Sequence, residues 1–357
     1  MFFSKFERND VILANRVKLT ANILFSGIGA QERGFRNSGL FDIEVVSTAD
    51  ISKEAVVSYA AIHCGMTPEM IENYEYPSKE EMIKYLENIN LGYDPNKKKV
   101  YDWKRLASRK DKMKGIEKYY LACKLTNNLG DISKIEKLPY ADFWTISSPC
   151  TDISVSGQMK GLDKDSGTRS SLVWDSARLL ETAKDEGRLP KYIMMENVKN
   201  LVSKKFKDQF DIICSTLDEI GFNIYWQVLN GKDCGIPQNR ERVFVIGIRK
   251  DIDKGKFTFP KPFDSGLRLR DMLEDEVDEK YYIENARSEQ LIQELIDNGS
   301  IEPLRESKQG CDLSINNPKV TDKANCIKAR YDSGITNRQS DNTGVITKEC
   351  QAKKQTE

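Results

Sequence analysis

The stretch Val17–Phe35, VKLTANILFSGIGAQERGF, decides the fold. Its apolar first half leads into a glycine-containing turn, FSGIG, and a helical pattern follows. Residues 41–50, FDIEVVSTAD, predict the next strand, and residues 51–63, ISKEAVVSYAAIH, predict the next helix. A strand that leads into a helix and then into another strand is the repeating unit of a parallel β-sheet covered by helices.

The same alternation continues to about residue 250. Strands are predicted over residues 141–150, 191–198, 223–231 and 240–251, and helices over residues 170–187 and 205–222. This order predicts an α/β fold with a doubly wound, mostly parallel sheet and helices on both faces. Residues 66–127 interrupt the alternation with charged amphipathic helices and are predicted to form a helical insertion. Beyond residue 262 the sequence is polar and turn-rich, so we predict one domain over residues 1–262 and a smaller one over 263–357.

Composition excludes several classes of protein. The 357 residues carry 55 basic and 55 acidic side chains, so global attraction to a polyanion is not implied, although a local basic face is compatible with this balance. No apolar run is long enough to cross a bilayer, and the charged start MFFSKFERND does not fit a signal peptide. The eight cysteines lack the spacing of a disulfide framework or a zinc site, which favours reduced thiols in a cytoplasmic protein and no metal.

The chain contains a single histidine, His63, at the end of a helical pattern. A partial positive charge is favourable at that end of a helix, so we interpret His63 as a C-terminal helix residue. A catalytic Cys–His or Ser–His pair would have to use it. A reactive cysteine elsewhere in the chain must therefore be activated in another way.

Chemically useful residues follow the predicted strands, where open α/β sheets bind their ligands. Taken alone, each has an ordinary explanation: Asp50 can cap a helix, Glu196 can be a structural strand-end residue, and Cys150 can be a packed thiol. Together, and in this order along an alternating chain, they form a much more specific pattern. The set comprises Gly27, Gly29, Asp50, Asp131, Pro149, Cys150, Glu196 and Asn197.

This pattern resembles the DNA cytosine-5 methyltransferases over about residues 18–262. The segment LFSGIGAQERGF is similar to the first cofactor motif of that family, and SSPCTDISVSGQMKGL is similar to its Pro-Cys nucleophile loop. The segments SGTRSSLVWDSARLL, MMENVKNL and IPQNRERVFVIG resemble three later motifs. The insertion, with EEMIKYLENI, is similar to bacterial members that modify CG. The resemblance implies a Rossmann-like methyltransferase domain over residues 1–262, a target-recognition domain over 263–357, and a bacterial restriction-modification setting.

The resemblance also implies a role for each matching residue. S-adenosyl-L-methionine is expected as the cofactor, not a dinucleotide, because the residue three after Gly29 is Glu32, not a third glycine. The expected cofactor-binding residues are Phe25, Gly27, Gly29, Asp50, Ile51, Asp131, Ile132, Pro149 and Leu172. The expected catalytic residues are Cys150, Glu196, Arg240 and Arg242. The expected substrate-binding residues are Ser154, Asn197 and Gln238.

Cytosine chemistry explains why these residue types occur together. C5 of cytosine is a poor nucleophile until a thiolate, here that of Cys150, adds at C6. Negative charge then develops on the base, and a carboxyl group such as that of Glu196 relieves it by donating a proton or a hydrogen bond at N3. Both faces of the ring must be reached, so the base has to flip out of double-stranded DNA.

Two departures from the family pattern keep alternatives open. Thr151 stands where glutamine is usual after the Pro-Cys pair, and the closing family motifs are not found before the last residues, KECQAKKQTE. The first hypothesis is an active DNA methyltransferase. The second is a tRNA cytosine-5 methyltransferase, and the third is a truncated or split-subunit member that binds DNA or cofactor. We therefore expect a second polypeptide to supply the missing motifs and to rescue a weak activity.

Overall fold

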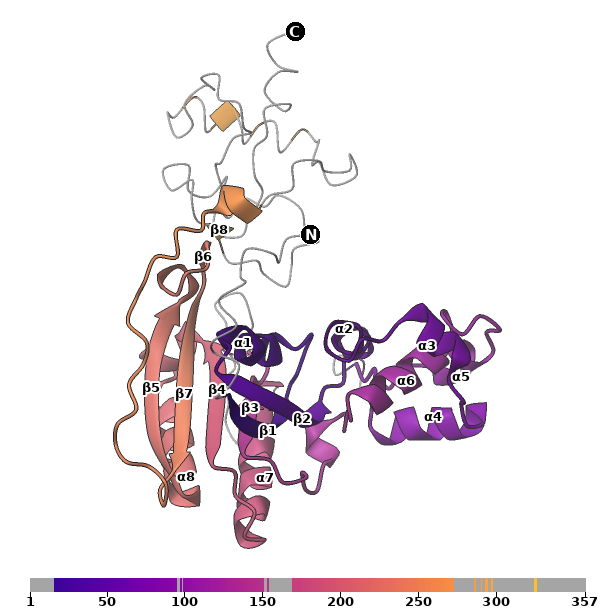
Figure 1. The fold of residues 1–357 in the computed structure, drawn as a ribbon, viewed down its shortest axis with the longest axis horizontal. Helices are drawn as coiled ribbons and strands as arrows, with labels where there is room; N and C mark the ends of the chain where they lie inside the picture. Colours follow the sequence, from indigo (N-terminus) through magenta and orange to yellow (C-terminus); the bar gives the residue numbers. More distant parts are fainter. Residues whose placement is uncertain are drawn as a thin grey trace. The chain divides into compact units, whose positions relative to one another are not determined.

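A computed structural model describes residues 16–94, 97, 99–150, 153 and 169–272, and the separate positions 286, 290, 293–294, 297 and 324–325 (Figure 1). The chain divides into two compact units. The first unit comprises Met1–Gln227 and Val243–Phe257, and the second unit comprises Val228–Arg242 and Thr258–Glu357.

A six-stranded sheet has the strand order β2-β1-β3-β4-β7-β5. Its strands are β1 (Val17–Leu24), β2 (Phe41–Ala49), β3 (Phe143–Ile146), β4 (Tyr192–Val198), β5 (Phe222–Asn230) and β7 (Glu241–Arg249). Strand β1 pairs in parallel with β2 and with β3, and β3 pairs in parallel with β4. The chain thus winds outward from β1 in both directions, which confirms the predicted doubly wound, mostly parallel sheet.

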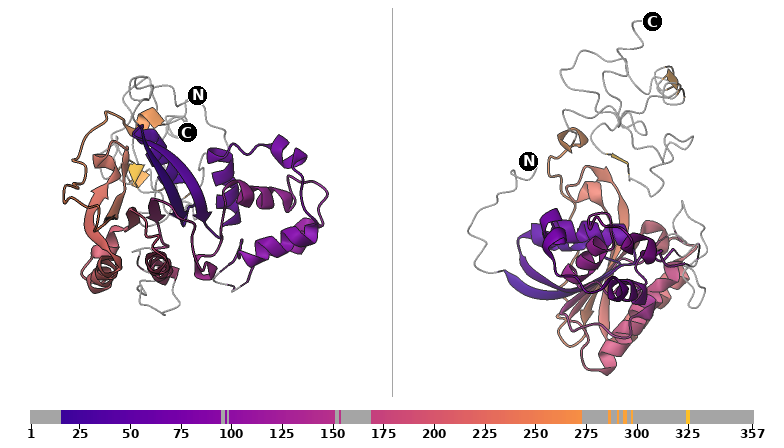
Figure 2. Two further views of the ribbon diagram at one scale, coloured as in Figure 1. Left: turned by 60° about the horizontal axis from the view of Figure 1, so that its bottom comes forward. Right: turned by 90° about the vertical axis from the view of Figure 1, so that its right-hand side faces the viewer.

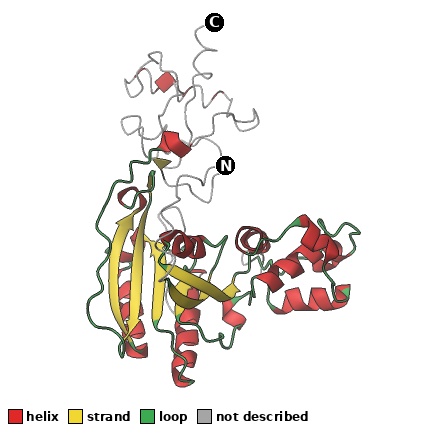
Figure 3. Ribbon diagram, in the orientation of Figure 1, coloured by secondary structure: helices red, strands yellow, loops and turns green. Residues whose placement is uncertain are grey.

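Helices cover both faces of this sheet (Figure 3). On one face, α1 (Ala30–Ser38) places the Phe35 ring 5.7 Å from the Phe41 ring and 5.0 Å from the Phe143 ring. On the other face lie α7 (Val173–Asp185) and α8 (Lys207–Ile220), against Ile146 and Met195. Because side chains alternate along a strand, Phe143 and Ile146 point to opposite faces and serve opposite layers.

Local sequence sets the helix ends. Ser52 is the N-cap of α2 (Lys53–His63), and its hydroxyl accepts a hydrogen bond from the Ala55 amide. Gly39, with a φ of 69°, ends α1 in the left-handed conformation that glycine adopts most easily. Gly221 ends α8, as the sequence predicts.

The helical insertion packs with α2 around one apolar core, which includes Val56 and Ala60 of α2. Its helices are coloured purple to magenta in Figure 2. Its helices are α3 (Pro68–Asn73), α4 (Lys79–Asn88), α5 (Trp103–Ala107) and α6 (Glu117–Leu125). A capping box between Ser78 and Glu81 begins α4, and buried Leu86 and Trp103 belong to the shared core. The two longer helices were predicted. The short helices α3 and α5 were not, because five or six residues carry too little periodicity.

The second unit contains a small parallel pairing between β6 (Gln238–Asn239) and β8 (Ala324–Asn325). Gly235 packs against the Phe263 ring, and the Phe263 amide donates to the Asp233 carbonyl at 2.8 Å. These contacts group residues 228–242 with the later part of the chain. The target-recognition domain over residues 263–357 stays a prediction, because most of that range lies outside the described residues.

Candidate active site

Four neighbouring loops begin at one edge of the sheet. Leu24 pairs with Ala49 on one side and with Ile146 on the other, and Ile146 pairs with Met195. The next residue in each strand is Phe25, Asp50, Ser147 and Glu196, respectively. The register therefore brings together the strand ends that carry the predicted cofactor-binding and catalytic residues of the first unit.

The loop after β1 adopts an unusual backbone. Phe25, Gly27 and Gly29 have φ angles of 56°, 53° and 86°, and such left-handed values are costly for a phenylalanine. Glycine is required at positions 27 and 29 for different reasons. A Cβ at Gly27 would meet no atom within 4 Å, whereas a Cβ at Gly29 would stand 2.3 Å from Nε2 of His63. The open side of Gly27 fits close ligand approach, and Gly29 is needed for packing against α2.

The Asp50 carboxylate fastens this loop to the end of β2. Its Oδ2 accepts the Gly27 amide at 2.8 Å, and its Oδ1 accepts the Ser52 amide at 2.7 Å. Burial raises the pKa of Asp50, although backbone hydrogen bonds from Ser52, Gly27 and Ile51 oppose the rise. The alternative that Asp50 merely caps α2 is wrong, because Ser52 occupies the N-cap position.

Asn128 is a site-building residue that the sequence analysis missed. Asn128 is 2% exposed, and its side-chain amide forms hydrogen bonds with both backbone polar groups of Asp50, as a neighbouring strand would. The Asp50 amide donates to its Oδ1 at 2.9 Å, and its Nδ2 donates to the Asp50 carbonyl at 3.0 Å. The same Oδ1 accepts the Gly130 amide at 3.4 Å. Asn128 therefore couples the end of β2 to the turn that contains Asp131.

That turn is held from both sides. Asn90 of the insertion donates to Oδ2 of Asp131 at 2.8 Å, and the Ser133 amide donates to Oδ1 at 3.0 Å. From α7, Arg178 donates to the Ile132 carbonyl at 3.1 Å, and the Ile132 side chain is buried. Hydrogen bonds therefore hold the predicted pair Asp131–Ile132 in place. Each carboxylate oxygen of Asp131 accepts one of them, Oδ2 from Asn90 and Oδ1 from the Ser133 amide.

Ile51 and Leu172 complete the predicted cofactor set. The Ile51 carbonyl accepts the Gly92 amide at 2.6 Å, which ties the insertion to the end of β2. Leu172 is half-buried and is the last residue of the short helix Arg169–Leu172, directly before α7. Their contact with a cofactor stays a prediction.

The loop after β3 is braced by two amide side chains. Gln31 of α1 donates to the Ser147 hydroxyl at 2.7 Å, and Asn197 donates to the Ser148 carbonyl and hydroxyl, both at 3.3 Å. Pro149 and Cys150 follow and are half-buried. Cys150 follows a buried strand, as the sequence predicts. Ser154 lies outside the described residues.

Glu196 and Asn197 end β4 beside that loop. Glu196 is half-buried. Asn197 is 2% exposed; its Nδ2 is bound to Ser148 and its Oδ1 accepts the Val198 amide at 2.8 Å. The polar atoms of Asn197 are engaged within the protein, so its geometry is that of a residue that positions the Pro-Cys loop. Direct contact of Asn197 with substrate stays a prediction.

Gln238, Arg240 and Arg242 belong to the second unit. The sequence predicts a strand over residues 240–251; in the structure β6 covers Gln238–Asn239 and β7 begins at Glu241, so Arg240 lies between two strands. The Arg240 backbone bonds to Asn230 Oδ1 and to the Gly231 amide instead, and Arg242 donates to the Glu241 carbonyl. The roles of these three residues stay predictions.

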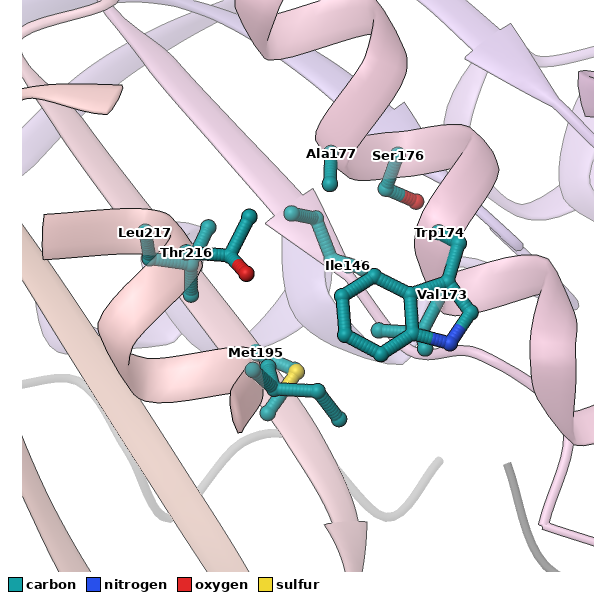
Figure 4. A pocket seen from close by; sticks show the side chains of 9 residues that line it. Ile146, Val173, Trp174, Ser176, Ala177, Met195, Thr216 and Leu217 are labelled. Atoms are coloured by element: carbon teal, nitrogen blue, oxygen red, sulfur yellow. The ribbon is translucent and has the colours of Figure 1, made fainter. Parts of the chain in front are cut away.

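A small apolar cavity of about 10 Å³ lies between the ends of β3 and β4 and helices α7 and α8 (Figure 4). Its lining includes Ile146, Met195, Trp174 and Leu217. This space is about that of one water molecule, so the cavity is a packing defect of the α7–α8 face and too small for a cofactor or base.

Within the described part of the chain, no three or more His, Cys, Asp or Glu side chains gather closely enough to hold a metal ion. None of the helices that the structure describes combines the length and apolar character of a membrane span.

A doubly wound sheet with a glycine loop after β1, an acid after β2 and a Pro-Cys pair after β3 is an arrangement of the Rossmann-like α/β methyltransferases. A sequence profile of the C-5 cytosine-specific DNA methylases matches residues 78–356, and the chain belongs to this family. It is a DNA (cytosine-5-)-methyltransferase, an enzyme that acts on DNA, and S-adenosylmethionine is the methyl donor that the family implies.

Two bacterial methyltransferases are similar to the chain over about three quarters of its length. The type II methyltransferase M2.ScrFI of Lactococcus lactis subsp. cremoris is 41% identical over 278 residues, which cover 76% of this chain and 72% of that protein. The orphan methyltransferase M.SssI of Spiroplasma monobiae is 34% identical over 275 residues, which cover 75% of this chain and 68% of that protein. A solved structure, the S. pombe Dnmt2 methyltransferase, is 16% identical with a TM-score of 0.46, and the match covers 88% of this chain and 72% of that chain.

Proposed function

We propose that this chain methylates C5 of cytosine in double-stranded DNA through a covalent bond between Cys150 and a flipped base. The observation that carries the proposal is the strand register. Neighbouring strands thereby carry the loop after β1, the Pro-Cys loop after β3 and Glu196 near the end of β4 at the same edge of the sheet. A methyl donor bound at the first loop would then lie next to a base held between the other two.

The residues present fit S-adenosylmethionine at the end of β1. Space is open beside Gly27, and the buried carboxylate of Asp50 retains lone pairs for ribose hydroxyls after binding two amides. Asp131, Ile132, Phe25, Ile51, Pro149 and Leu172 complete the proposed binding set. When bound, the cofactor supplies an electrophilic methyl group on a sulfonium.

Cys150 and Glu196 perform the steps on the base. The Cys150 thiolate forms a bond to C6, and the electron pair of the C5–C6 double bond moves to C5, which accepts the methyl group. Glu196 donates a proton or a hydrogen bond at N3 and thereby stabilises the charge that develops on the ring. Transfer of the C5 proton to solvent water then restores the C5–C6 double bond and releases the Cys150 thiolate.

His63 does not take part in activating the thiol in this proposal. Its ring is 3% exposed and bonded to the Ile28 carbonyl under the β1 loop. Gln238, Arg240 and Arg242 are proposed to bind the substrate, because their side-chain donors suit the cytosine O2 and the flanking phosphates.

One experiment tests the proposal and separates the two nucleic-acid substrates. Purified chain is incubated with methyl-labelled S-adenosylmethionine and with duplex DNA or tRNA, under single-turnover conditions. Transfer to DNA cytosine, with a covalent adduct when the target base is 5-fluorocytosine, is expected. Transfer to tRNA alone would replace the proposal with the RNA alternative.

A further inference from the structure

A buried polar cluster lies between α1 and α2, directly beneath the loop after β1. It consists of Glu32 from α1 and of Tyr59 and His63 from α2, and Arg36 of α1, whose side chain is 46% exposed, closes it toward solvent. The side chains of Glu32 and His63 are each only 3% exposed. A buried polar side chain destabilises the fold unless its polar atoms form hydrogen bonds, so a buried cluster of this kind suggests a functional role.

The hydrogen bonds fix the orientation of the His63 ring. Its Nε2 lies 3.1 Å from the Ile28 carbonyl oxygen, which can only accept, so Nε2 carries the proton. On the other side of the ring, Nδ1 lies 3.7 Å from Oε2 of Glu32. The Tyr59 hydroxyl donates to the same Oε2, and Arg36 Nε donates to Oε1 at 2.7 Å. Glu32 is thus held by two partners and faces the imidazole.

The ring could not approach the loop if Gly29 had a side chain. A Cβ at that position would lie 2.3 Å from His63 Nε2, 2.5 Å from His63 Cδ2 and 2.9 Å from Tyr59 Cε2. The absence of a side chain at Gly29 therefore lets the His63 imidazole reach the Ile28 carbonyl. The effect of this contact is to pin the peptide between Gly27 and Gly29, two residues with left-handed φ angles.

We propose that His63 is a positioning residue for the methyl donor, because it holds the loop after β1 in its binding conformation through the Ile28 carbonyl. This inference rests on the proposed cofactor site. Ile28 is 56% exposed, so packing of its own side chain does not hold the peptide in place. Glu32 and Tyr59 orient the ring from below, and none of the three touches the reacting atoms.

Two amide substitutions of His63 provide a matched test. In His63→Gln the side-chain nitrogen takes a position close to that of Nε2 and still donates to Ile28. In His63→Asn the shorter side chain places its donor near the former Nδ1 and does not reach Ile28. Both variants are neutral and polar, so they differ chiefly in this hydrogen bond.

The dissociation constant of S-adenosylmethionine is measured by calorimetry, together with kcat and KM for the cofactor. His63→Asn should weaken binding about tenfold, the effect of losing one hydrogen bond, whereas His63→Gln should stay within about threefold of wild type. In both variants kcat at saturating cofactor should stay within about threefold of wild type. Equal affinities of the two variants, or a loss confined to kcat, would overturn the inference.

Wild-type binding in the same experiment separates this inference from the proposed function. If the wild-type chain binds no S-adenosylmethionine, the proposed cofactor site itself is wrong. If it binds and both variants bind equally well, only the role of His63 is wrong. Thermal unfolding of each variant verifies that the comparison is made between folded proteins.

Discussion

The loops after β1 and β3 start side by side and are held in different ways. In the loop after β1, side chains from other elements grip the main chain: Asp50 binds the Gly27 amide and His63 binds the Ile28 carbonyl. In the loop after β3, Gln31 and Asn197 hold the two serines before Pro149, and the chain then presents one thiol. The contacts around the loop after β1 fix the conformation of its backbone. The contacts around the loop after β3 fix the position of a single side chain, that of Cys150.

This difference predicts two kinds of mutant. Changes around the loop after β1 should weaken cofactor binding and leave the chemical step nearly intact. Changes around the loop after β3 should slow the chemical step and leave cofactor binding nearly intact, because only the position of the reacting groups is altered.

The largest effect is expected from Cys150→Ala. Removing the thiol prevents addition at C6, so kcat should fall by a factor on the order of 10⁴ or more, as for other covalent nucleophiles. The adduct with 5-fluorocytosine DNA, detected by intact-protein mass spectrometry, should disappear. Cys214→Ala, at another half-buried cysteine, should retain it. An adduct that persists in Cys150→Ala would remove Cys150 from the mechanism.

Glu196→Gln should have the next largest effect. The variant keeps the shape of the side chain but cannot donate a carboxyl proton, and kcat should fall by roughly 10²–10⁴, the usual contribution of general acid catalysis. DNA affinity, measured by fluorescence anisotropy, should change less than about threefold. Glu181→Gln on the exposed face of α7 is the control. A Glu196→Gln rate within threefold of wild type would mean that Glu196 only anchors the strand end.

Asp50→Ala alters the loop after β1 and should therefore affect cofactor binding. Loss of a carboxylate that binds the loop and the ribose should weaken cofactor binding about 10- to 100-fold, with kcat at saturation little changed. Calorimetry measures the affinity, and Asp42→Ala at the opposite, exposed end of β2 is the control. Normal binding by Asp50→Ala would separate Asp50 from the cofactor site.

The pH dependence of wild-type binding tests the same carboxylate. Burial raises the pKa of Asp50 above its ordinary value of 3.8, and protonation removes one of its acceptor oxygens. Cofactor affinity should therefore be full at neutral pH and fall on acidification through a pKa that lies above 3.8. A decline that appears only below that value would argue against a raised pKa in the free protein.

Most of the sheet could be predicted from sequence, because each buried strand is a short apolar run between turn signals. The strand-end residues could be predicted for the same reason, since Asp50 and Glu196 break such runs and Cys150 follows one after a short polar turn. The residues that hold them could not. Asn128 reaches Asp50 across 78 positions of sequence, and nothing near Asn128 signals this pairing.

The roles of Gly29 and His63 show the same limit. The sequence assigns Gly29 to ligand approach and His63 to a helix end. His63 does end α2, but its ring fills the space that a Gly29 side chain would need. Only the packing of α1 on α2 brings these two residues together, 34 positions apart in the printed sequence.

The sharpest test of the comparison uses two buried asparagines, one behind each loop. Asn128 and Asn197 are each 2% exposed, and each donates from its side-chain amide to a backbone carbonyl of a neighbouring segment. Asn128 serves Asp50, and Asn197 serves Ser148. The two alanine variants therefore delete the same chemical group in similar surroundings on opposite sides of the site.

Asn128→Ala should raise the KM and the dissociation constant for S-adenosylmethionine several-fold to about tenfold, with kcat within about threefold of wild type. Asn197→Ala should lower kcat by a similar factor and leave the cofactor dissociation constant within about threefold. Each should also destabilise the fold by about 1–3 kcal/mol in urea denaturation, because buried partners lose their hydrogen bonds. If both variants changed the same kinetic parameter, the two loops would not have separate functions. The assignment of cofactor binding to the loop after β1 and of thiol positioning to the loop after β3 would then be wrong.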